Sequence, residues 1–167
     1  MKRRAARGQP DRGRPPTKPR ALTSPHKASL RFQLGNPKGI DPEHIRNLFR
    51  AAGWTEDIVR YSAVQIRKLL RQSHIVLTAW QGTTLVGLAS AVSDGVLSGM
   101  VQNLVVHPRY RRHGVGTRLL RMLAREMTGQ RIASLYVLGT RGRRARAFFN
   151  RAGFRPLRWN VYVRLTR

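Results

Sequence analysis

A long segment without positive charge constrains the fold of this chain more than any other feature of its sequence. Residues 72–108 contain no lysine or arginine, although these two types make up 33 of the 167 residues. Apolar and β-branched residues fill most of the segment, and strands of that composition are typical of a sheet covered on both faces. The segment therefore predicts a meander of largely buried strands at residues 74–80, 84–92 and 100–106.

Helical patterns flank the predicted meander. Asp41 is suited to cap a helix, because Pro42 fits the first helical position, and Gly53 would end that helix. Thr55-Glu56-Asp57 predicts the start of a second helix, which runs to about Gln72. The remaining pattern predicts strands at 30–34, 132–138 and 161–165 and helices at 115–127 and 143–152. This order of elements favours an α+β fold, with a mixed sheet flanked by helices.

Length and composition limit the classes of protein to which the chain can belong. The 167 residues fit one domain and a tail, and the absence of cysteine excludes disulfides, a thiolate zinc site and a cysteine nucleophile. No apolar run approaches the roughly 20 residues that span a bilayer, and no secretory signal is evident. We therefore expect a cytoplasmic protein with no membrane partner and no metal site.

The first 29 residues are basic and poor in large apolar side chains. They are rich in Arg, Pro and Gly, so we expect a disordered tail at 1–29 and a folded domain over 30–167. An Arg-rich, acid-poor leader is also typical of an organelle transit peptide. The density of proline and the lack of an amphipathic helical pattern favour the disordered tail.

The positive charge gathers at the two ends of the chain. The formal net charge is +26, with ten basic residues in 1–31 and sixteen in 109–167. Such a surplus attracts polyanions and repels polyamines, so nucleic acid, an acidic protein or a phosphorylated cofactor would be suitable partners. The alternative is a solvated basic surface that has no specific partner.

The segment 103–120 carries the pattern with the most chemical information. A predicted strand ends at Val106, an arginine-rich loop follows, and Gly114 and Gly116 precede a helix. Glycines at a strand-to-helix turn let backbone N–H groups approach a ligand, and a helix N-terminus adds positive potential. Side-chain charge comes from Arg109, Arg111 and Arg112. Together these features predict an anion site suited to a pyrophosphate.

Two common glycine-loop motifs do not match this segment. A dinucleotide-binding fingerprint needs a third glycine where Leu119 stands and an acidic residue near Tyr136, and neither is present. A nucleoside-triphosphate loop needs Gly-Lys followed by Ser or Thr, which this chain lacks. Both of these nucleotide-binding classes are therefore excluded.

The segment instead resembles the cofactor-binding motif of the GNAT superfamily of acetyl-CoA-dependent N-acetyltransferases. The family signature is Arg or Gln, two residues, Gly, one residue, then Gly or Ala, and residues 111–116 (Arg-Arg-His-Gly-Val-Gly) fill it. Residues 147–154 are similar to the family's final helix and its Gly-Phe ending. The resemblance covers residues 30–167 and implies a mixed, mostly antiparallel central sheet flanked by helices. More narrowly, residues 85–95 are similar to a plastid and cyanobacterial branch of amine and protein acetyltransferases.

The resemblance implies acetyl-CoA as the cofactor and assigns residues to it. Near the side chain of Arg111, backbone N–H groups would hold the pyrophosphate, namely those of Arg112, His113, Gly114, Val115 and Gly116, with the helix start at Thr117. The backbone of Leu104, Val105 and Val106 would pair with the pantetheine arm in the manner of an added strand. Phe148 and Phe149 would line the cofactor wall, although packing of their helix is an equally good interpretation.

The sequence offers few groups for the acid and base steps of acetyl transfer. Asn103 stands where members of the family often carry a carboxylate, and Phe149 stands where they usually carry a tyrosine. Among the seven acidic residues, Asp94 is left near the sheet, in a turn between two strands, and is the candidate base. Tyr136 is the candidate acid if it faces the cofactor. We expect direct transfer in a ternary complex, with water-mediated deprotonation of the amine.

Functions from different classes fit these observations. The leading hypothesis is an N-acetyltransferase that acts on a small amine or on a peptide or protein amine. A non-catalytic acyl-CoA-binding module would explain the residues at Asn103 and Phe149. A nucleic-acid- or ribosome-associated protein would use the basic tail to bind nucleic acid without sequence preference. A homodimer is compatible with each of these hypotheses.

Overall fold

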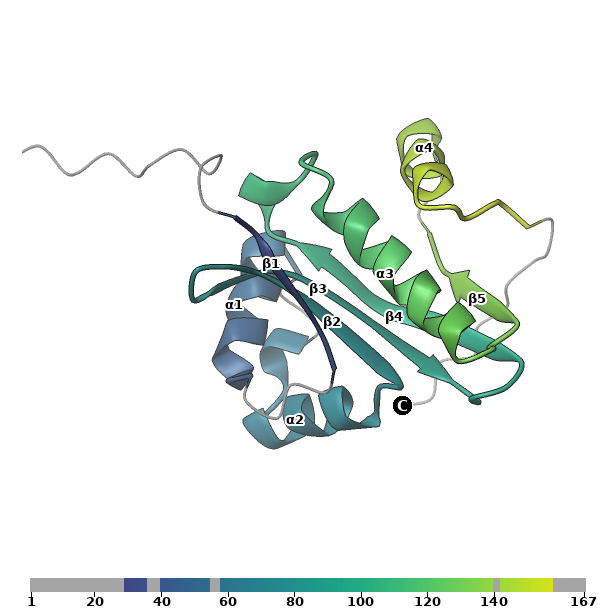
Figure 1. Ribbon diagram of the computed structural model, residues 1–167. Coiled ribbons are helices and arrows are strands. Elements are labelled where there is room, and N and C mark those ends of the chain that lie inside the picture. The colour runs from purple at the N-terminus through teal and green to yellow at the C-terminus, as the bar shows by residue number, and fades with distance from the viewer. Residues whose placement is uncertain (1–28, 36–39, 55–57, 140–141, 158–167) are drawn as a thin grey trace, which may run out of the picture.

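The chain folds into a five-stranded sheet with helices on both faces (Figure 1). The computed structural model describes residues 29–35, 40–54, 58–139 and 142–157. In chain order the elements are β1 (Arg31–Leu34), α1 (Pro42–Ala52), the 3-10 helix η1 (Ile58–Arg60), α2 (Ala63–Gln72), β2 (Ile75–Gln81), β3 (Thr84–Ser93), β4 (Ser98–Val106), the 3-10 helix η2 (Pro108–Tyr110), α3 (Val115–Gly129), β5 (Ser134–Val137) and α4 (Arg143–Arg151). The predicted α+β class is confirmed.

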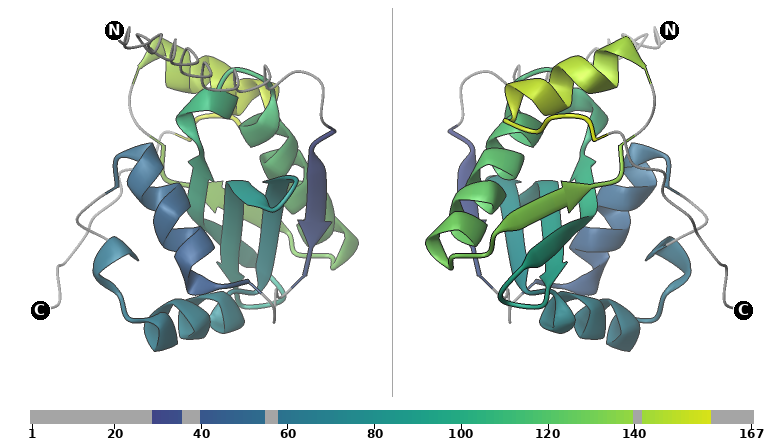
Figure 2. Two further views of the ribbon diagram at one scale, coloured as in Figure 1. Left: turned by 90° about the vertical axis from the view of Figure 1, so that its left-hand side faces the viewer. Right: turned by 90° about the vertical axis from the view of Figure 1, so that its right-hand side faces the viewer.

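The sheet is mostly antiparallel, and β4 and β5 pair over only part of the length of β4. The strand order is β1-β2-β3-β4-β5, and the β4–β5 pair is the parallel one. This pair joins Ser98–Val101 to Ser134–Val137, so that in the described part of the chain the rest of β4 has no partner on that side. The free edge of β4 leads directly to the loop before α3. α1 and α2 cover one face of the sheet and α3 covers the other (Figure 2).

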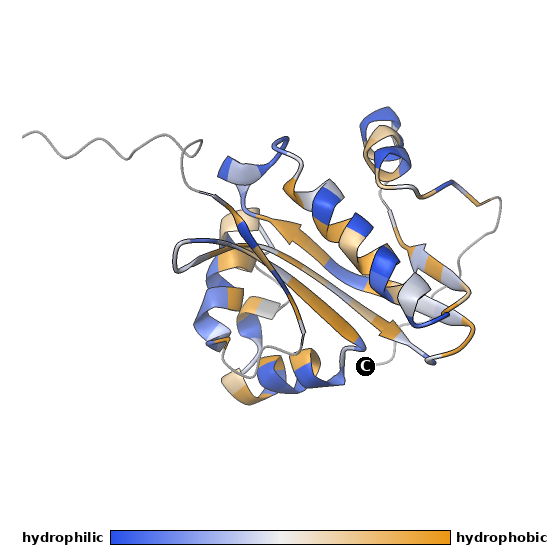
Figure 3. Cartoon of the chain, in the orientation of Figure 1, coloured by the Kyte–Doolittle hydropathy of each residue, from blue (hydrophilic) through white to orange (hydrophobic). Residues whose placement is uncertain are grey.

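The charge-free segment is buried because both faces of its strands pack against helices. On β2, Leu77 belongs to the core beneath α3, whereas the adjacent Val76 belongs to the core beneath α1 and α2. A lysine or arginine at either position would lose its hydration with no partner to replace it. In Figure 3 the strands are mostly orange or white, and blue residues are concentrated on the helices. The predicted meander is thus confirmed.

A glycine in β3 lets α3 approach the sheet closely. A Cβ atom at Gly87 would lie 3.0 Å from Leu119 Cδ1 and 3.2 Å from Val115 Cγ1, both on α3. The small residue therefore allows the first turns of α3 to pack directly on β3. This contact places the N-terminus of α3 beside the end of β4, because Gly87 pairs with Val106.

The helix signals of the sequence were correct for α1 and wrong for the start of α2. The Asp41 carboxylate accepts a hydrogen bond from the Glu43 N–H at 2.9 Å, and Gly53 ends α1 with φ +87°. α2 begins at Ala63, because Ser62 and Gln65 form a reciprocal capping box. The Ser62 hydroxyl accepts from the Gln65 N–H, and the Gln65 side chain accepts from the Ser62 N–H.

Other predicted elements differ in length or lie outside the described residues. β5 covers residues 134–137 rather than 132–138, and β4 begins at residue 98 rather than 100. Residues 1–28, the predicted helix start at 55–57 and the predicted last strand at 161–165 lie outside the described residues.

Candidate active site

The loop between β4 and α3 is held by contacts among its own residues. Nδ1 of His107 accepts a hydrogen bond from the backbone N–H of Arg109 at 3.3 Å, and its ring meets Tyr110 edge-on, with centroids 5.7 Å apart. Burial, together with the positive charges of Arg109 and Arg111, lowers the pKa of His107 below its usual 6.5. The imidazole is therefore mainly neutral at pH 7, which suits its role as a hydrogen-bond acceptor in the loop.

α3 begins with uncapped N–H groups that face the loop. Gly114 has φ +79°, a left-handed conformation, and no side chain caps the helix. The N–H of Arg118 bonds the Gly114 carbonyl at 2.9 Å, so the helix supplies no acceptor for the N–H groups of residues 115–117. Uncapped N–H groups and the positive end of the helix dipole form a favourable site for an anion.

Arg111 ties this loop to the opposite side of the molecule. Its Nε donates to the Val106 carbonyl at 3.0 Å, and its Nη2 donates to the Ala52 carbonyl at 3.2 Å. Ala52 is the last residue of α1, on the other face of the sheet. The guanidinium therefore fixes the loop against α1 and keeps its charge beside the anion site.

A cleft of about 1490 Å³ opens between the end of β4, α3, α4 and the end of α1. Its lining joins segments far apart in the sequence, and the predicted cofactor residues form its centre. Those that line the cleft are Leu104, Val105, Val106, Arg111, Arg112, Gly114, Val115, Gly116, Thr117 and Phe148. The structure thus gathers most of the predicted cofactor set around one cavity.

Two members of that predicted set do not line the cleft. His113 is exposed in the loop before α3. Phe149 turns into the core, with its ring centroid 5.1 Å from Phe148 and 6.4 Å from Phe154. Its ring also fills the space at Gly139, where a Cβ atom would lie 2.5 Å from the phenylalanine. Packing, the other interpretation of Phe149, therefore accounts for its position.

Arginines that sequence reasoning left unassigned form the outer part of the cleft. α3 contributes Arg118, Arg121 and Arg125, which recur at helical spacing, and α4 contributes Arg144 and Arg151. Arg121 donates through Nε and Nη2 to the Arg151 carbonyl at 3.2 and 2.6 Å, which ties α3 to the end of α4. The guanidinium of Arg118 lies 4.1 Å above the ring of Phe32. The spacing of these arginines along α3 was the signal in the sequence that could have indicated an anion-binding surface, but the same spacing is equally typical of a solvated helix face.

A second cavity, of about 650 Å³, lies on the face of the sheet covered by α1 and α2. Trp54 lines both this cavity and the cleft, so the two spaces adjoin at that residue. The lining residues are Phe49, Trp54, Tyr61, Gln65, Lys68, Leu69, Gln72, Ser73, Val92, Gln102 and Asn103. Sequence reasoning did not find this cavity, because its residues come from separate helices and strands whose contact depends on the fold.

Hydrogen bonds fix two walls of the second cavity. Asn103 donates from Nδ2 to the hydroxyl of the buried Ser90 at 2.9 Å, which leaves its amide oxygen as an acceptor. Arg46 of α1 donates through Nη2 to the Tyr61 carbonyl at 2.8 Å and also pairs with Glu43. These bonds hold Asn103 and the segment at Tyr61 in place, and both residues line the cavity.

The position of Asp94 argues against its predicted role as a base. Its carboxylate accepts hydrogen bonds from the N–H groups of Val96, Leu97 and Ser98 at 2.8 to 3.0 Å and from the Ser98 hydroxyl at 3.0 Å. These bonds, chiefly those from Ser98 and Val96, lower the pKa of Asp94 to about 2. The residue lies at the turn of the β3–β4 hairpin, whereas the cleft lies at the opposite end, where Gly87 pairs with Val106. Asp94 stabilises the turn and lines neither cavity.

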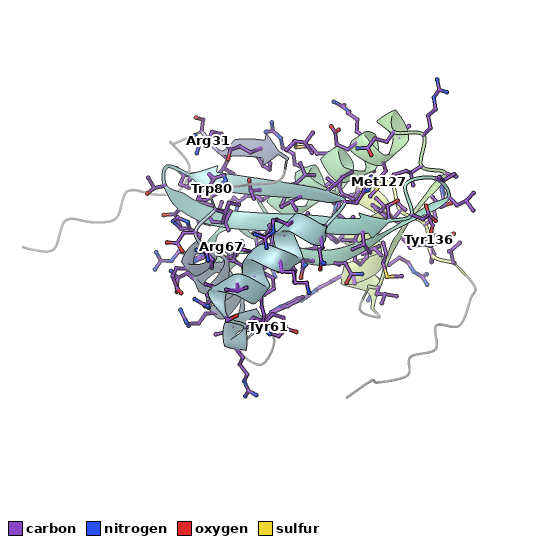
Figure 4. The ribbon with its side chains drawn as sticks, turned by 90° about the horizontal axis from the view of Figure 1, so that it is seen from below. Arg31, Tyr61, Arg67, Trp80, Met127 and Tyr136 are labelled. Carbon is purple, nitrogen blue, oxygen red and sulfur yellow. The ribbon has the colours of Figure 1, made fainter. Side chains whose placement is uncertain are left out.

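Tyr136 also lies away from both cavities. It pairs with Met100 at the edge of the sheet and is 36% exposed. Figure 4 shows it well apart from Tyr61, which marks the second cavity. The condition for its predicted acid role, that it faces the cofactor, is therefore not met by this geometry. Its position is that of an exposed tyrosine on a strand at the edge of the described sheet.

Neither a membrane-spanning helix nor a metal-binding cluster occurs among the described residues. None of the helices there is long and apolar enough to cross a membrane. The described chain also contains no group of three or more His, Cys, Asp or Glu residues placed to hold a metal ion.

Comparison of the sequence with known proteins agrees with this geometry. The Acetyltransferase (GNAT) family matches residues 42–154. An uncharacterized N-acetyltransferase, ycf52, from Porphyra purpurea is 26% identical over 106 residues, which cover 61% of this chain and 59% of the relative. A ycf52-like protein from Prochlorococcus marinus is 22% identical, and the match covers 66% of this chain and 62% of that protein. The chain therefore spans about three-fifths of the length of these relatives.

Solved structures share the fold. A GNAT family acetyltransferase, SP0256 from Streptococcus pneumoniae, superposes with a TM-score of 0.65 at 22% identity, over 83% of this chain and 99% of that one. An aminoglycoside 6'-N-acetyltransferase complexed with coenzyme A gives 0.57 at 23% identity, over 65% of this chain and 61% of that one. The family match spans α1 to α4, including the loop and both cavities. The chain belongs to the GNAT family of acetyltransferases.

Proposed function

We propose that this protein transfers the acetyl group of acetyl-CoA directly to a primary amine. The observation that carries the proposal is the meeting of two cavities at Trp54, one built for an anionic cofactor and one lined by neutral polar groups. Direct transfer needs both reactants at the same time, and adjoining cavities on the two faces of the sheet would hold them in contact. When bound, acetyl-CoA supplies an acetyl thioester as the electrophile.

The cleft fits the chemistry of coenzyme A. The uncapped N–H groups of residues 115–117 and the side chain of Arg112 suit the pyrophosphate. In the described part of the chain, the edge of β4 beyond Val101 has no strand partner on that side, which suits pairing with the two amides of the pantetheine arm. An aminoglycoside 6'-N-acetyltransferase complexed with coenzyme A has the same fold, which supports coenzyme A as the kind of ligand proposed here.

The outer cleft suits the remaining phosphate of the cofactor. Coenzyme A carries a 3'-phosphate on its ribose, and the arginines of α3 and α4 extend the positive surface beyond the pyrophosphate site. Of these, Arg125 and Arg144 have no hydrogen bond to other described residues that would compete for their guanidinium groups. We therefore assign these two residues to the 3'-phosphate.

The residues of this chain contribute mainly by positioning. Among the described residues, no aspartate or glutamate lines either cavity, so the amine would lose its proton to water rather than to a carboxylate. The amide oxygen of Asn103, at the junction of β4 with the second cavity, is suited to accept a hydrogen bond from the amine or from that water. Trp54 would exclude bulk water from the point where the thioester and the amine meet.

A polycationic acceptor is disfavoured. The aminoglycosides named for one structural neighbour carry several amines, whereas the second cavity here contains Lys68 and no described carboxylate. Several ammonium groups beside a lysine, in a chain of net charge +26, would repel it and weaken binding, and no described group offsets this repulsion. We therefore propose an acceptor with one amine.

A non-catalytic acyl-CoA-binding protein is the second candidate, because no described tyrosine lines the cofactor cleft and Phe149 packs in the core. Calorimetry with acetyl-CoA and a thiol-release assay with a panel of primary amines separate the two candidates. Transfer predicts binding and amine-dependent thiol release. Binding without thiol release from any amine would favour the second candidate, and failure to bind acetyl-CoA would exclude both.

The other expected partners remain predictions. The basic segment 1–28 lies outside the described residues, and its binding of nucleic acid can be tested by the salt dependence of RNA affinity with and without that segment. A homodimer and a cytoplasmic location are likewise predictions, to be checked by light scattering and by imaging of the tagged protein.

A further inference from the structure

We infer that the second cavity selects a primary amine that also carries a carboxylate, and that Lys68 binds this carboxylate. The inference rests on the proposed acetyl transfer, because it names the acceptor class for the same site. It starts from the charge of the cavity. Of the eleven lining residues, Lys68 is the one whose side chain is charged at neutral pH.

The place of Lys68 defines which end of an acceptor it would meet. The amine must lie near Trp54, where the second cavity adjoins the cofactor cleft. Lys68 lies on α2, which forms a different wall of the cavity from Trp54. A group that reaches Lys68 is therefore separated from the reacting amine by several bonds, and a lysine ammonium there attracts an anion.

Neutral polar groups surround Lys68 and suit the same ligand. Gln65 and Gln72 lie about one turn on either side of it along α2, and both line the cavity. Their amide N–H groups can donate to a carboxylate beside the ammonium. Trp54 and Tyr61, which are 41% and 44% exposed, offer apolar surface for the part of the ligand between its two ends.

No described carboxylate is placed to neutralise Lys68. Each acid in the described part of the chain has another position or partner. Asp41 caps α1, Glu43 pairs with Arg46, Asp94 accepts bonds within its turn, and Glu126 lies on α3, which covers the opposite face of the sheet. Among the described residues, none is therefore paired with the charge of Lys68 in place of a ligand.

A series of ω-amino carboxylates, from β-alanine to 6-aminohexanoate, tests the inference. Each acid is compared with its amide and with a diamine of equal length, in thiol-release assays with acetyl-CoA at pH 8. At the best length we expect kcat/KM for the acid to exceed that for the amide by about three- to fivefold, the range of a partly exposed ion pair. The diamine should be the poorest of the three. Equal rates for acid and amide, or a preference for the diamine, would overturn the inference.

Variants assign the preference to Lys68. Lys68→Gln should reduce the acid-to-amide ratio to about one, whereas Lys68→Arg should keep it. Arg67→Gln is the matched control, because Arg67 is an exposed neighbour on α2 that does not line the cavity (Figure 4). It removes the same charge and should leave the ratio unchanged. A ratio that survives Lys68→Gln, or falls equally in Arg67→Gln, would rule out a specific role for Lys68.

A binding measurement separates this inference from the proposed function. Calorimetry of the same acids and amides with the full chain saturated with coenzyme A reports selectivity without turnover. Tighter binding of the acid, lost in Lys68→Gln, supports the inference even if no amine is acetylated, in which case only the proposed transfer fails. Equal binding of acid and amide contradicts the inference even if amines are acetylated.

Discussion

The Nη2 atom of Arg111 lies 3.2 Å from the carbonyl oxygen of Ala52 and donates a hydrogen bond to it, while Nε of the same side chain donates to Val106. The guanidinium thus joins the loop between β4 and α3 to the C-terminus of α1. Trp54, which lines both cavities, follows Ala52 by two residues. Arg111 is therefore placed to fix the position of the second cavity as well as that of the cleft.

Replacement of Arg111 by lysine should impair both sites. Lysine keeps the charge but cannot donate two hydrogen bonds in a fixed planar geometry. We expect the Kd for coenzyme A and the KM for the acceptor each to rise by about three- to tenfold, since a hydrogen bond makes a net contribution of about 0.5 to 1.5 kcal/mol. Arg109→Lys, in the same loop but outside the cleft, is the control. A change in cofactor affinity alone would show that Arg111 has no influence on the acceptor side.

Gly114 is required for its backbone conformation rather than for space. Nothing lies within 4 Å of a Cβ atom built there, but φ is +79°. Gly114→Ala should therefore lower the free energy of unfolding by about 1 to 2 kcal/mol and weaken coenzyme A binding. Gly129→Ala, at an equally open helical position without positive φ, should be neutral or stabilising by up to about 1 kcal/mol. Chemical denaturation of the two variants decides the point, and equal effects would contradict it.

Arg125 and Arg144, in the outer part of the cleft, should bind the 3'-phosphate of the cofactor. In the double variant Arg125→Gln/Arg144→Gln we expect the affinity for coenzyme A to fall by about tenfold, because two charge-assisted contacts are lost, and the affinity for dephospho-coenzyme A to change little. As a control, Arg143→Gln/Arg146→Gln removes two charges from residues of α4 that do not line the cleft. Calorimetry with both ligands provides the measurement. An equal loss for both ligands would indicate a nonspecific effect of charge.

Asp94 should contribute to stability rather than to catalysis. Its pKa of about 2 lies below the unfolded value of about 3.9, so its stabilising effect is complete above the unfolded pKa. The effect is lost as the pH falls from about 5 towards 2. Asp94→Asn should therefore lower the Tm at pH 7, with a smaller difference from the wild type at pH 3. Its kcat/KM should stay within about twofold of wild type, and a loss beyond about a hundredfold would restore Asp94 as the base.

Local signals in the sequence were sufficient for most of the fold. Asp41 and Pro42 define the start of α1 through a cap and a preset φ angle, and the charge-free strands report burial on both faces. The sequence predicted a helix start at Thr55-Glu56-Asp57, because a threonine followed by two acidic residues is typical of a helix N-terminus, whereas α2 begins at Ala63. The Ser62-to-Gln65 capping box was the signal that could have located it correctly.

The candidate site was predictable only where it is local in sequence. The loop and the first turn of α3 form one continuous segment, so most residues of the motif at 111–116 were expected together, and they line the cleft. The cavity around Lys68 depends on contacts between α2, β3 and β4, which no single segment encodes. Counting acids by elimination selected Asp94, but its hydrogen bonds to the turn depend on the folded hairpin.

The most direct test of acetyl transfer is a stoichiometric measurement of both products. The full chain is incubated with acetyl-CoA labelled in the acetyl group and with 6-aminohexanoate, and the labelled amide and the free thiol are quantified together. The proposed function predicts one acetylated amine for each thiol released, with both falling in parallel when the amine is omitted. Two results would contradict it if they recur across the panel of amines. One is thiol release without labelled amide. The other is the absence of both products at concentrations where calorimetry shows saturation by acetyl-CoA.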